Sequence, residues 1–142
     1  MQVQEIMQTN VQLADPNMTV RDVARRMRAD NIGALPVGEN DRLIGMVTDR
    51  DIVVRAVAED RSAGNTTVRE VMSDGICYCF EDDDVTEAAG VMAKHQVRRL
   101  PVLNRDKRLV GVVGLSDLGR SAEGAAQSAL RGIAEPTDKE RR

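Results

Sequence analysis

The sequence contains almost no aromatic side chains: one tyrosine, one phenylalanine and no tryptophan in 142 residues. The core must therefore be built from Val, Ile, Leu, Met and Ala, and a nucleobase would be held by aliphatic side chains and backbone groups. Histidine occurs once and cysteine twice, without a Cys-x-x-Cys spacing, which argues against a zinc site within one chain. We find no set of nucleophile and base, so we expect no catalytic residues and no enzymatic activity.

Long hydrophobic runs are also absent. No segment approaches the roughly 20 apolar residues of a membrane-spanning helix, and the first residues lack the basic and apolar regions of a signal peptide. We therefore expect a cytoplasmic protein without membrane association. The net charge of −3 argues against general affinity for nucleic acid, which depends on clustered Lys and Arg.

The dominant positive feature is an internal repeat. Residues 3–7 resemble residues 68–72, and Leu35-Pro36-Val37 recurs as Leu100-Pro101-Val102. Each copy predicts a short helix, a brief strand, an amphipathic helix, a hairpin and a closing helix. The short helices are expected at 2–8 and 67–73, the brief strands at 11–14 and 76–80, and the closing helices at 49–59 and 115–121. The amphipathic helices are expected to start after Thr19 and Asp84, which resemble caps. Their apolar faces carry Val20, Val23, Ala24 and Met27 in the first copy and Val85, Ala88, Ala89 and Met92 in the second. The fold class is therefore α+β, with two units related by pseudo-two-fold symmetry.

The repeat also divides the chain into domains. We assign residues 1–62 to the first unit, 63–121 to the second, 122–135 to a C-terminal helix and 136–142 to a disordered tail. The helix at 122–135 is rich in alanine, which suggests either a docking helix or part of a dimer contact.

A strand-to-helix corner occurs in both copies, as Gly45-Met46-Val47-Thr48-Asp49-Arg50-Asp51 and as Gly111-Val112-Val113-Gly114-Leu115-Ser116-Asp117. We call these the first corner and the second corner. A hydroxyl and a carboxylate placed like Thr48 and Asp51 can bind sugar hydroxyls and an oxyanion, and phosphate would meet free N–H groups there. The same pattern is also a helix N-cap with a partnering acid. In the second corner Gly114 replaces the hydroxyl, which predicts a weaker site.

With Ile32-Gly33-Ala34-Leu35-Pro36-Val37 and Arg98-Arg99-Leu100-Pro101-Val102, the two corners resemble a cystathionine-β-synthase (CBS) domain pair of the stand-alone bacterial type. The resemblance runs from residue 3 to residue 118. It implies two β-α-β-β-α units in a module that is often dimeric. It also implies a regulatory sensor that binds AMP, ADP, ATP, S-adenosylmethionine or a similar ligand in clefts between the units, with no obligatory cofactor.

The resemblance also implies which residues touch the ligand. Thr48, Asp51 and Asp117 would contact ribose or phosphate, with Asp117 in the weaker site. The base would be held by the segment before and within the Leu-Pro strand, and phosphate by basic residues in the second copy. The residues at these positions are Ile32, Ala34, Pro36, Arg98 and Arg99.

Several alternatives stay open. One of the two arginines could instead face solvent while the other pairs with the acidic run at 81–84, itself a solvated loop and helix cap or a metal cage. Cys77 and Cys79 are either buried small hydrophobes or redox thiols. A ligand-free dimeric scaffold for a protein partner is the second function considered. Nucleic-acid binding is the third, through Arg98, Arg99, Arg105, Lys107 and Arg108.

Overall fold

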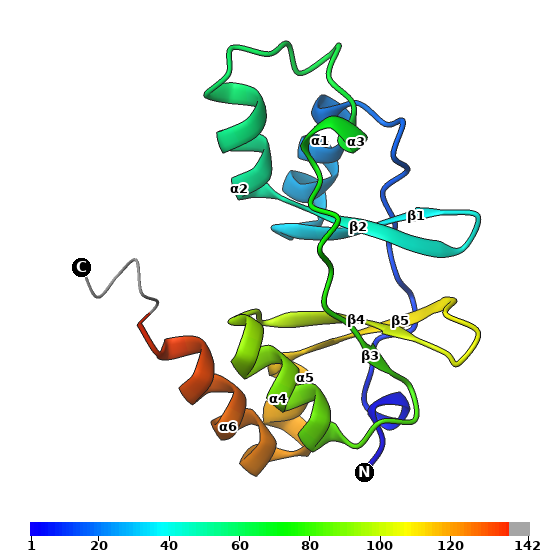
Figure 1. Ribbon diagram of the computed structural model, residues 1–142, viewed down its shortest axis with the longest axis vertical. Coiled ribbons are helices and arrows are strands. Elements are labelled where there is room, and N and C mark those ends of the chain that lie inside the picture. Colours follow the sequence, from blue (N-terminus) through cyan, green and yellow to red (C-terminus); the bar gives the residue numbers. More distant parts are fainter. Residues whose placement is uncertain (137–142) are drawn as a thin grey trace. The chain divides into compact units, whose positions relative to one another are not determined.

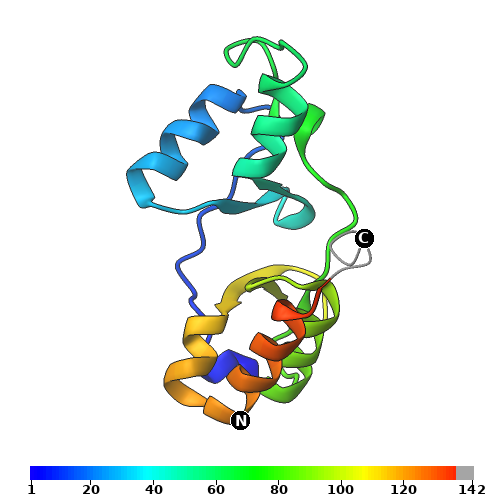
Figure 2. The same ribbon diagram turned by 90° about the vertical axis from the view of Figure 1, so that its left-hand side faces the viewer.

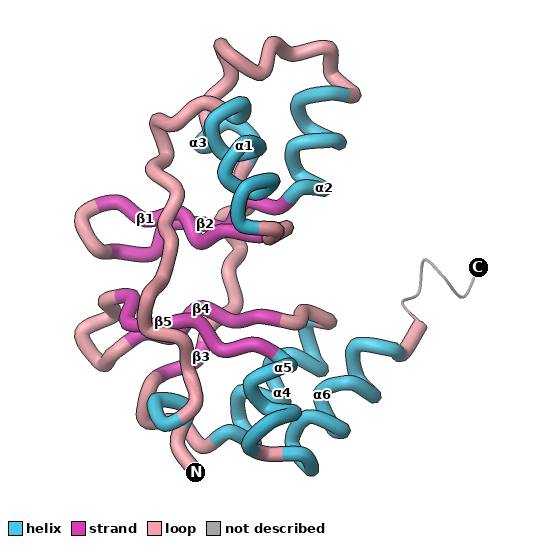
Figure 3. The backbone as a smooth tube through the Cα atoms, turned by 180° about the vertical axis from the view of Figure 1, so that it is seen from behind, coloured by secondary structure: helices cyan, strands magenta, loops and turns pink. Residues whose placement is uncertain are grey.

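The computed structural model describes residues 1–136, so the predicted tail lies outside the described residues apart from Pro136. The chain forms two compact units (Figure 1). The central unit is the continuous stretch Gln12–Ile76, and the split unit combines Met1–Val11 with the chain from Cys77 onward. In each unit the helices lie on one face of the strands (Figure 3). No helix among the described residues is long and apolar enough to cross a membrane.

The central unit contains a two-stranded antiparallel sheet and short helices. Its elements are α1 (Val20–Asp30), β1 (Ala34–Glu39), β2 (Arg42–Thr48), α2 (Asp49–Ile52), the π-helical turn η2 (Val53–Val57) and α3 (Val68–Val71). The predicted helix at 49–59 is thus realised as α2 followed by η2. The strand predicted at 11–14 is reduced to a single bridge between Ala14 and Val37, because Pro16 follows closely and has no N–H to donate.

Helix α1 shows why the amphipathic pattern was informative. Thr19 accepts a hydrogen bond from the Asp22 N–H at 3.1 Å, which satisfies a free donor at the helix start. Val20, Val23 and Met27 are buried in the core of the central unit. The predicted start and apolar face of this helix are therefore confirmed.

The split unit contains a three-stranded sheet in the order β3-β4-β5, with β3 parallel to β4. Its elements are the 3-10 turn η1 (Val3–Glu5), β3 (Cys79–Phe80), α4 (Val85–His95), β4 (Arg99–Leu103), β5 (Leu109–Gly114), α5 (Leu115–Ser121) and α6 (Glu123–Ala134). Helix α6 packs against α4 and α5 (Figure 2). Of the two roles predicted for the alanine-rich segment, the docking helix is the one observed.

The compact units and the sequence repeats have different boundaries, because the first residues of each repeat pack on the other repeat. We call residues 1–11 the leading segment; their counterpart in the second repeat ends at Ile76. Gln8 and Val112 exchange backbone hydrogen bonds of 2.8 and 2.9 Å in the split unit. Ser73 and Met46 do the same in the central unit, at 2.8 and 2.9 Å. Sequence similarity identifies equivalent positions but not the copy on which a segment packs, so boundaries drawn at 62 and 63 describe repeats rather than compact units.

Candidate functional site

The first corner is a reciprocal capping box. The Thr48 hydroxyl accepts from the Asp51 N–H at 3.0 Å, and Asp51 Oδ2 accepts from the Thr48 N–H at 2.9 Å. The capping interpretation is thus confirmed. Both side chains can form further hydrogen bonds, because Asp51 Oδ1 and the Thr48 hydroxyl proton have no partner within residues 1–136. The two groups can still bind hydroxyls or an oxyanion.

The segment predicted to hold the base lies beside this corner. The Asp49 N–H donates to the Gly33 carbonyl at 2.9 Å, and Ala34 pairs with Thr48 in the sheet. Ile32 is half-buried and packs against the core, whereas Pro36 is buried opposite Met46. The structure therefore brings Ala34 directly next to Thr48, with Pro36 two sheet pairs further away.

We expect Thr48→Ala to cost about 1 kcal/mol of unfolding free energy, because it removes an N-cap acceptor. Thr48→Ser keeps the hydroxyl and should lose much less. Urea denaturation of both variants measures the difference. Equal stability of the alanine variant and the parent would show that the capping box contributes nothing.

The second corner is built differently, because its carboxylate is buried and already accepts three hydrogen bonds. Asp117 is only 5% exposed. Its Oδ2 accepts from the Gly114 N–H at 2.7 Å, and its Oδ1 accepts from Gln8 Nε2 at 3.0 Å and from Arg120 Nη2 at 2.5 Å. The Asp117 carboxylate thus accepts from the Gly114 N–H as Asp51 does from the Thr48 N–H, whereas the side-chain half of the capping box is missing because Gly114 has no hydroxyl.

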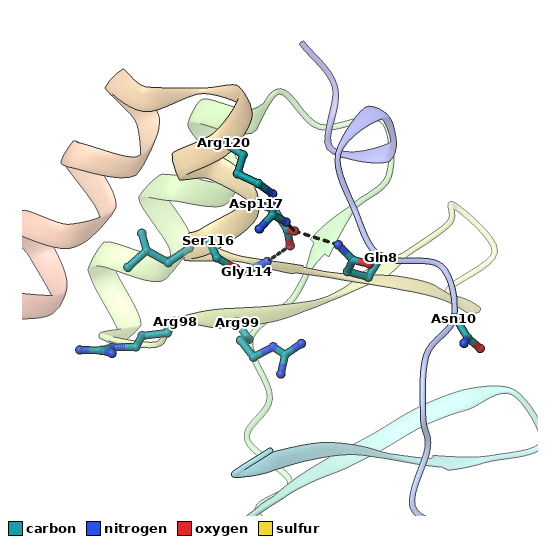
Figure 4. Close-up of a pocket in the computed structure, with 9 residues that line it drawn as sticks. Gln8, Asn10, Arg98, Arg99, Gly114, Ser116, Asp117 and Arg120 are labelled. Carbon is teal, nitrogen blue, oxygen red and sulfur yellow. Dashed lines mark hydrogen bonds and ion pairs between the residues drawn. The ribbon is translucent and has the colours of Figure 1, made fainter. Parts of the chain in front are cut away.

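A pocket of about 720 Å³ opens at the second corner, within the split unit (Figure 4). Its lining combines the leading segment, the start of β4, and the β5–α5 turn. The lining residues are Gln8, Asn10, Arg98, Arg99, Gly114, Leu115, Ser116, Asp117 and Arg120. Three of the predicted ligand residues, Arg98, Arg99 and Asp117, therefore share one pocket.

The proposed pairing of Arg98 or Arg99 with the acidic run is wrong. Both side chains are exposed and form no hydrogen bond or ion pair with any described residue. Arg105 takes that place instead, pairing with Asp82 at 2.8 Å and lying over the Phe80 ring at 4.1 Å. Arg98 and Arg99 thus leave their guanidinium groups available to the pocket.

The two pocket residues that contact the Asp117 carboxylate through their side chains, Gln8 and Arg120, were not predicted from the sequence. Arg120 lies three positions after Asp117, and i, i+3 pairs of opposite charge meet on a helix, so this signal was available. Gln8 carried no such signal. It reaches Asp117 only because the leading segment packs on the other repeat, which a single sequence does not reveal.

The acidic run at 81–84 is a loop and helix cap, as one of its two interpretations predicted. Asp83 Oδ2 accepts from the Phe80 N–H at 2.8 Å, and Asp84 caps α4. Hydrogen bonds from the Thr86 hydroxyl and N–H, and one from the terminal amine, lower the pKa of Asp84 to about 2. Within residues 1–136 no group of three or more His, Cys, Asp or Glu is placed to hold a metal ion.

Cys79 is buried, and burial together with the nearby Asp83 charge raises its pKa to about 12. Burial also raises the pKa of the half-buried Cys77 thiol. Because the thiolate is the reactive form, Cys79 in the folded protein should react with iodoacetamide about a thousandfold more slowly than a free thiol. Mass spectrometry after timed alkylation, with and without urea, measures this. Fast labelling of Cys79 without urea would refute its assignment as a buried hydrophobe.

Comparison with known proteins agrees with this architecture. Residues 3–57 and 68–123 each match the CBS domain, and the chain therefore belongs to the CBS-domain family, as a pair of repeats. The predicted α+β fold of two CBS units is confirmed. CBS pairs are regulatory modules that often bind adenosine ligands, and stand-alone members are generally regulatory proteins rather than enzymes.

Two bacterial proteins show the similarity in sequence. The CBS domain-containing protein YhcV of Bacillus subtilis is 41% identical over 133 residues, which are 92% of this chain and 94% of that protein. Hypoxic response protein 1 of Mycobacterium tuberculosis is 40% identical over 117 residues, or 82% of this chain and 81% of that protein.

Solved structures show the similarity in fold. The crystal structure of Hypoxic Response Protein I, with two coordinated zinc ions, has a TM-score of 0.77 and 39% identity and covers 84% of this chain and 98% of its own. The CBS domain pair of protein MJ0100, in complex with 5-methylthioadenosine and S-adenosyl-L-methionine, has a TM-score of 0.74 and 27% identity. The match covers 87% of this chain and 97% of the MJ0100 chain.

Proposed function

We propose that this protein is a regulatory sensor that binds an adenosine-containing ligand such as AMP, ADP, ATP or S-adenosylmethionine. The observation that carries the proposal is the pocket of about 720 Å³ at the second corner, within the roughly 300–1,000 Å³ typical of small-molecule sites. It joins a carboxylate that can accept from ribose hydroxyls to guanidinium groups that can bind phosphate. The adenosine-type ligands of MJ0100 support the choice of ligand class.

The pocket supports the second corner more strongly than the sequence did. Gly114 was expected to weaken it, yet Asp117, Arg98 and Arg99 all line the same pocket. The first corner remains a second proposed site, with Thr48 and Asp51 toward ribose or phosphate. Its Ile32 and Ala34 would lie against the base, and Pro36 behind them in the sheet.

Signalling requires a ligand that prefers one arrangement of the protein over another. The hydrogen bond from Gln8 to Asp117 offers a route within the split unit. Gln8 belongs to the leading segment and donates to Asp117 Oδ1, the oxygen that we propose accepts from ribose. Ligand binding would therefore change how firmly this segment is held.

Thermal unfolding with each candidate ligand tests the proposal. Ligand at 100 times its dissociation constant should stabilise the protein by about 2.7 kcal/mol, which raises Tm by several degrees for a domain of this size. Asp117→Ala and Asp51→Ala should each reduce the ligand-induced shift. Each shift is measured against the variant's own ligand-free Tm, because both substitutions also remove a helix-cap partner. No shift with AMP, ADP, ATP, NADH or S-adenosylmethionine at millimolar concentration would refute the proposal.

A second function, a dimeric scaffold for a protein partner, is favoured by an exposed aliphatic cluster on η2. Val53, Val54 and Val57 are 57%, 46% and 65% exposed, and clustered apolar side chains at a surface often mark an interaction site. We propose that this cluster contacts a second copy of the chain in a homodimer.

Val54→Glu combined with Val57→Glu should shift the protein toward monomer in sedimentation velocity, because the charges would be buried in the contact. Leu130→Glu, at an exposed position of α6, is the matched control and should leave the oligomeric state unchanged. Dissociation by the control but not by the double variant would place the contact on α6 instead.

A further inference from the structure

The pocket at the second corner carries three guanidinium groups and one carboxylate, in a chain whose net charge is −3. Arg99 begins β4 and Arg98 precedes it; their side chains point to opposite sides, whereas Arg120 of α5 lies beside Asp117 (Figure 4). Among residues 1–136, no other charged side chain lines the pocket. The local charge is therefore opposite in sign to that of the whole chain and suits an anionic ligand.

The three arginines differ in their polar partners. Arg98 and Arg99 have no polar partner among the described residues, whereas Arg120 Nη2 lies 2.5 Å from Asp117 Oδ1. The Arg120 side chain is 65% exposed and the Asp117 side chain only 6%. Arg120 is the partner that can move, because its side chain lies mostly in solvent, and Asp117 keeps the hydrogen bonds from the Gly114 N–H and Gln8 Nε2 when Arg120 leaves.

The pair also occupies the atom that a ribose would need. Asp117 Oδ2 accepts from the Gly114 N–H in a buried hydrogen bond, whereas Oδ1 accepts from Arg120 and Gln8 in bonds that are only partly buried. Oδ1 is therefore the oxygen that a ribose hydroxyl can reach, and Arg120 and Gln8 already donate to it. A neutral nucleoside has no anionic group to which Arg120 could donate after leaving Asp117. A phosphorylated nucleoside offers a second anion, to which a guanidinium can make bidentate hydrogen bonds.

We infer that Arg120 is a specificity-determining residue that makes this pocket select phosphorylated nucleosides over neutral ones. In the free protein Arg120 covers Asp117. When a phosphorylated ligand enters, Arg120 moves from the carboxylate to the phosphate, together with Arg98 and Arg99, and Asp117 Oδ1 becomes available to the ribose. This inference rests on the proposed function and specifies the ligand class of that site.

The first repeat provides an internal comparison. The residues equivalent to Arg98, Arg99 and Arg120 are Gly33, Ala34 and Val54. None of these can bind phosphate through a charged side chain. The arginine set that we propose to select for phosphate therefore has no counterpart at these three positions of the first repeat, although both corners keep the carboxylate.

Isothermal titration of the full chain with adenosine, AMP and ADP at fixed salt tests the inference. The parent protein should bind AMP and ADP at least tenfold more tightly than adenosine. Arg120→Met should weaken AMP binding about tenfold to a hundredfold, the usual worth of a hydrogen bond between charged groups. It should leave adenosine binding unchanged or slightly tighter, because Asp117 Oδ1 is freed.

Two further variants separate selection from a structural role. Arg120→Lys keeps the charge without the bidentate geometry and should recover part of the preference for AMP. Arg131→Met removes an exposed arginine of α6 that does not line the pocket, so it should change neither affinity. A purely structural Arg120 would weaken adenosine and AMP equally on substitution.

The outcomes separate the role of Arg120 from the proposed binding of an adenosine-type ligand. Equal affinities for adenosine and AMP in the parent protein, or equal losses for both ligands in Arg120→Met, overturn the role of Arg120 and leave the proposed function standing. Absence of binding by all three ligands at millimolar concentration overturns both.

Discussion

Gly111→Ala should detach the leading segment from the split unit and destabilise the protein by about 3.5–5 kcal/mol. A Cβ at Gly111 would lie 2.7 Å from Met7 Sδ and 2.8 Å from the Gln8 carbonyl oxygen. Because the Gln8 carbonyl oxygen is a backbone atom, the backbone of the leading segment must move. The movement would break the two backbone hydrogen bonds between Gln8 and Val112, worth about 1 kcal/mol each, and expose buried Val3, worth about 1.5–3 kcal/mol.

Urea denaturation measures the loss, and hydrogen exchange over residues 1–11 shows whether the segment has separated. Gly119→Ala is the matched control, because a Cβ there meets nothing within 4 Å. Since Gly119 lies in α5, alanine should stabilise the control by about 0.5–1 kcal/mol. Similar stability of the two variants, with the exchange of residues 1–11 unchanged, would contradict the assigned role of Gly111.

Gly132→Ala should displace α6 from α4 and cost about 2–3 kcal/mol. A Cβ at Gly132 would lie 2.6 Å from Ala93 Cα and closer still to Ala93 Cβ. Neither helix can yield without moving its backbone, and overpacking of this kind typically costs about 1–3 kcal/mol. Displacement would also break the hydrogen bonds from Gln96 Nε2 to the Gly132 and Glu135 carbonyls, which cap the end of α6.

Gly124→Ala gives the opposite expectation within the same helix. A Cβ at Gly124 meets nothing within 4 Å, so the helical preference of alanine should dominate and raise stability slightly. Thermal unfolding of the two variants compares packing with helix propensity directly. If both variants are stabilised, α6 does not depend on close approach to α4.

The sequence was sufficient for local structure. The hydroxyl or carboxylate at Thr19, Thr48 and Asp84 predicted helix starts, and the structure confirms all three caps. Apolar residues at helical spacing predicted the buried faces of α1 and α4. These features depend on residues within one or two turns of each other, which is the range that a single sequence encodes clearly.

The candidate site could be predicted only in part. Asp117, Arg98 and Arg99 followed from the repeated corner and the Leu-Pro strand, and they do line one pocket. The weaker binding predicted from the missing hydroxyl at Gly114 stays a prediction, and the pocket has further polar groups from Gln8 and Arg120. Gln8 reaches Asp117 from 109 positions earlier, a long-range contact that no local pattern encodes.

The exchange of leading segments also sets an order for folding during synthesis. The central unit is one continuous stretch, Gln12–Ile76, and can fold as soon as it leaves the ribosome. The leading segment is translated earlier, but Gln8 must wait for Asp117, 109 residues later. At about 5–20 residues per second this wait is about 5–20 seconds. The segment translated first is therefore among the last to reach its place.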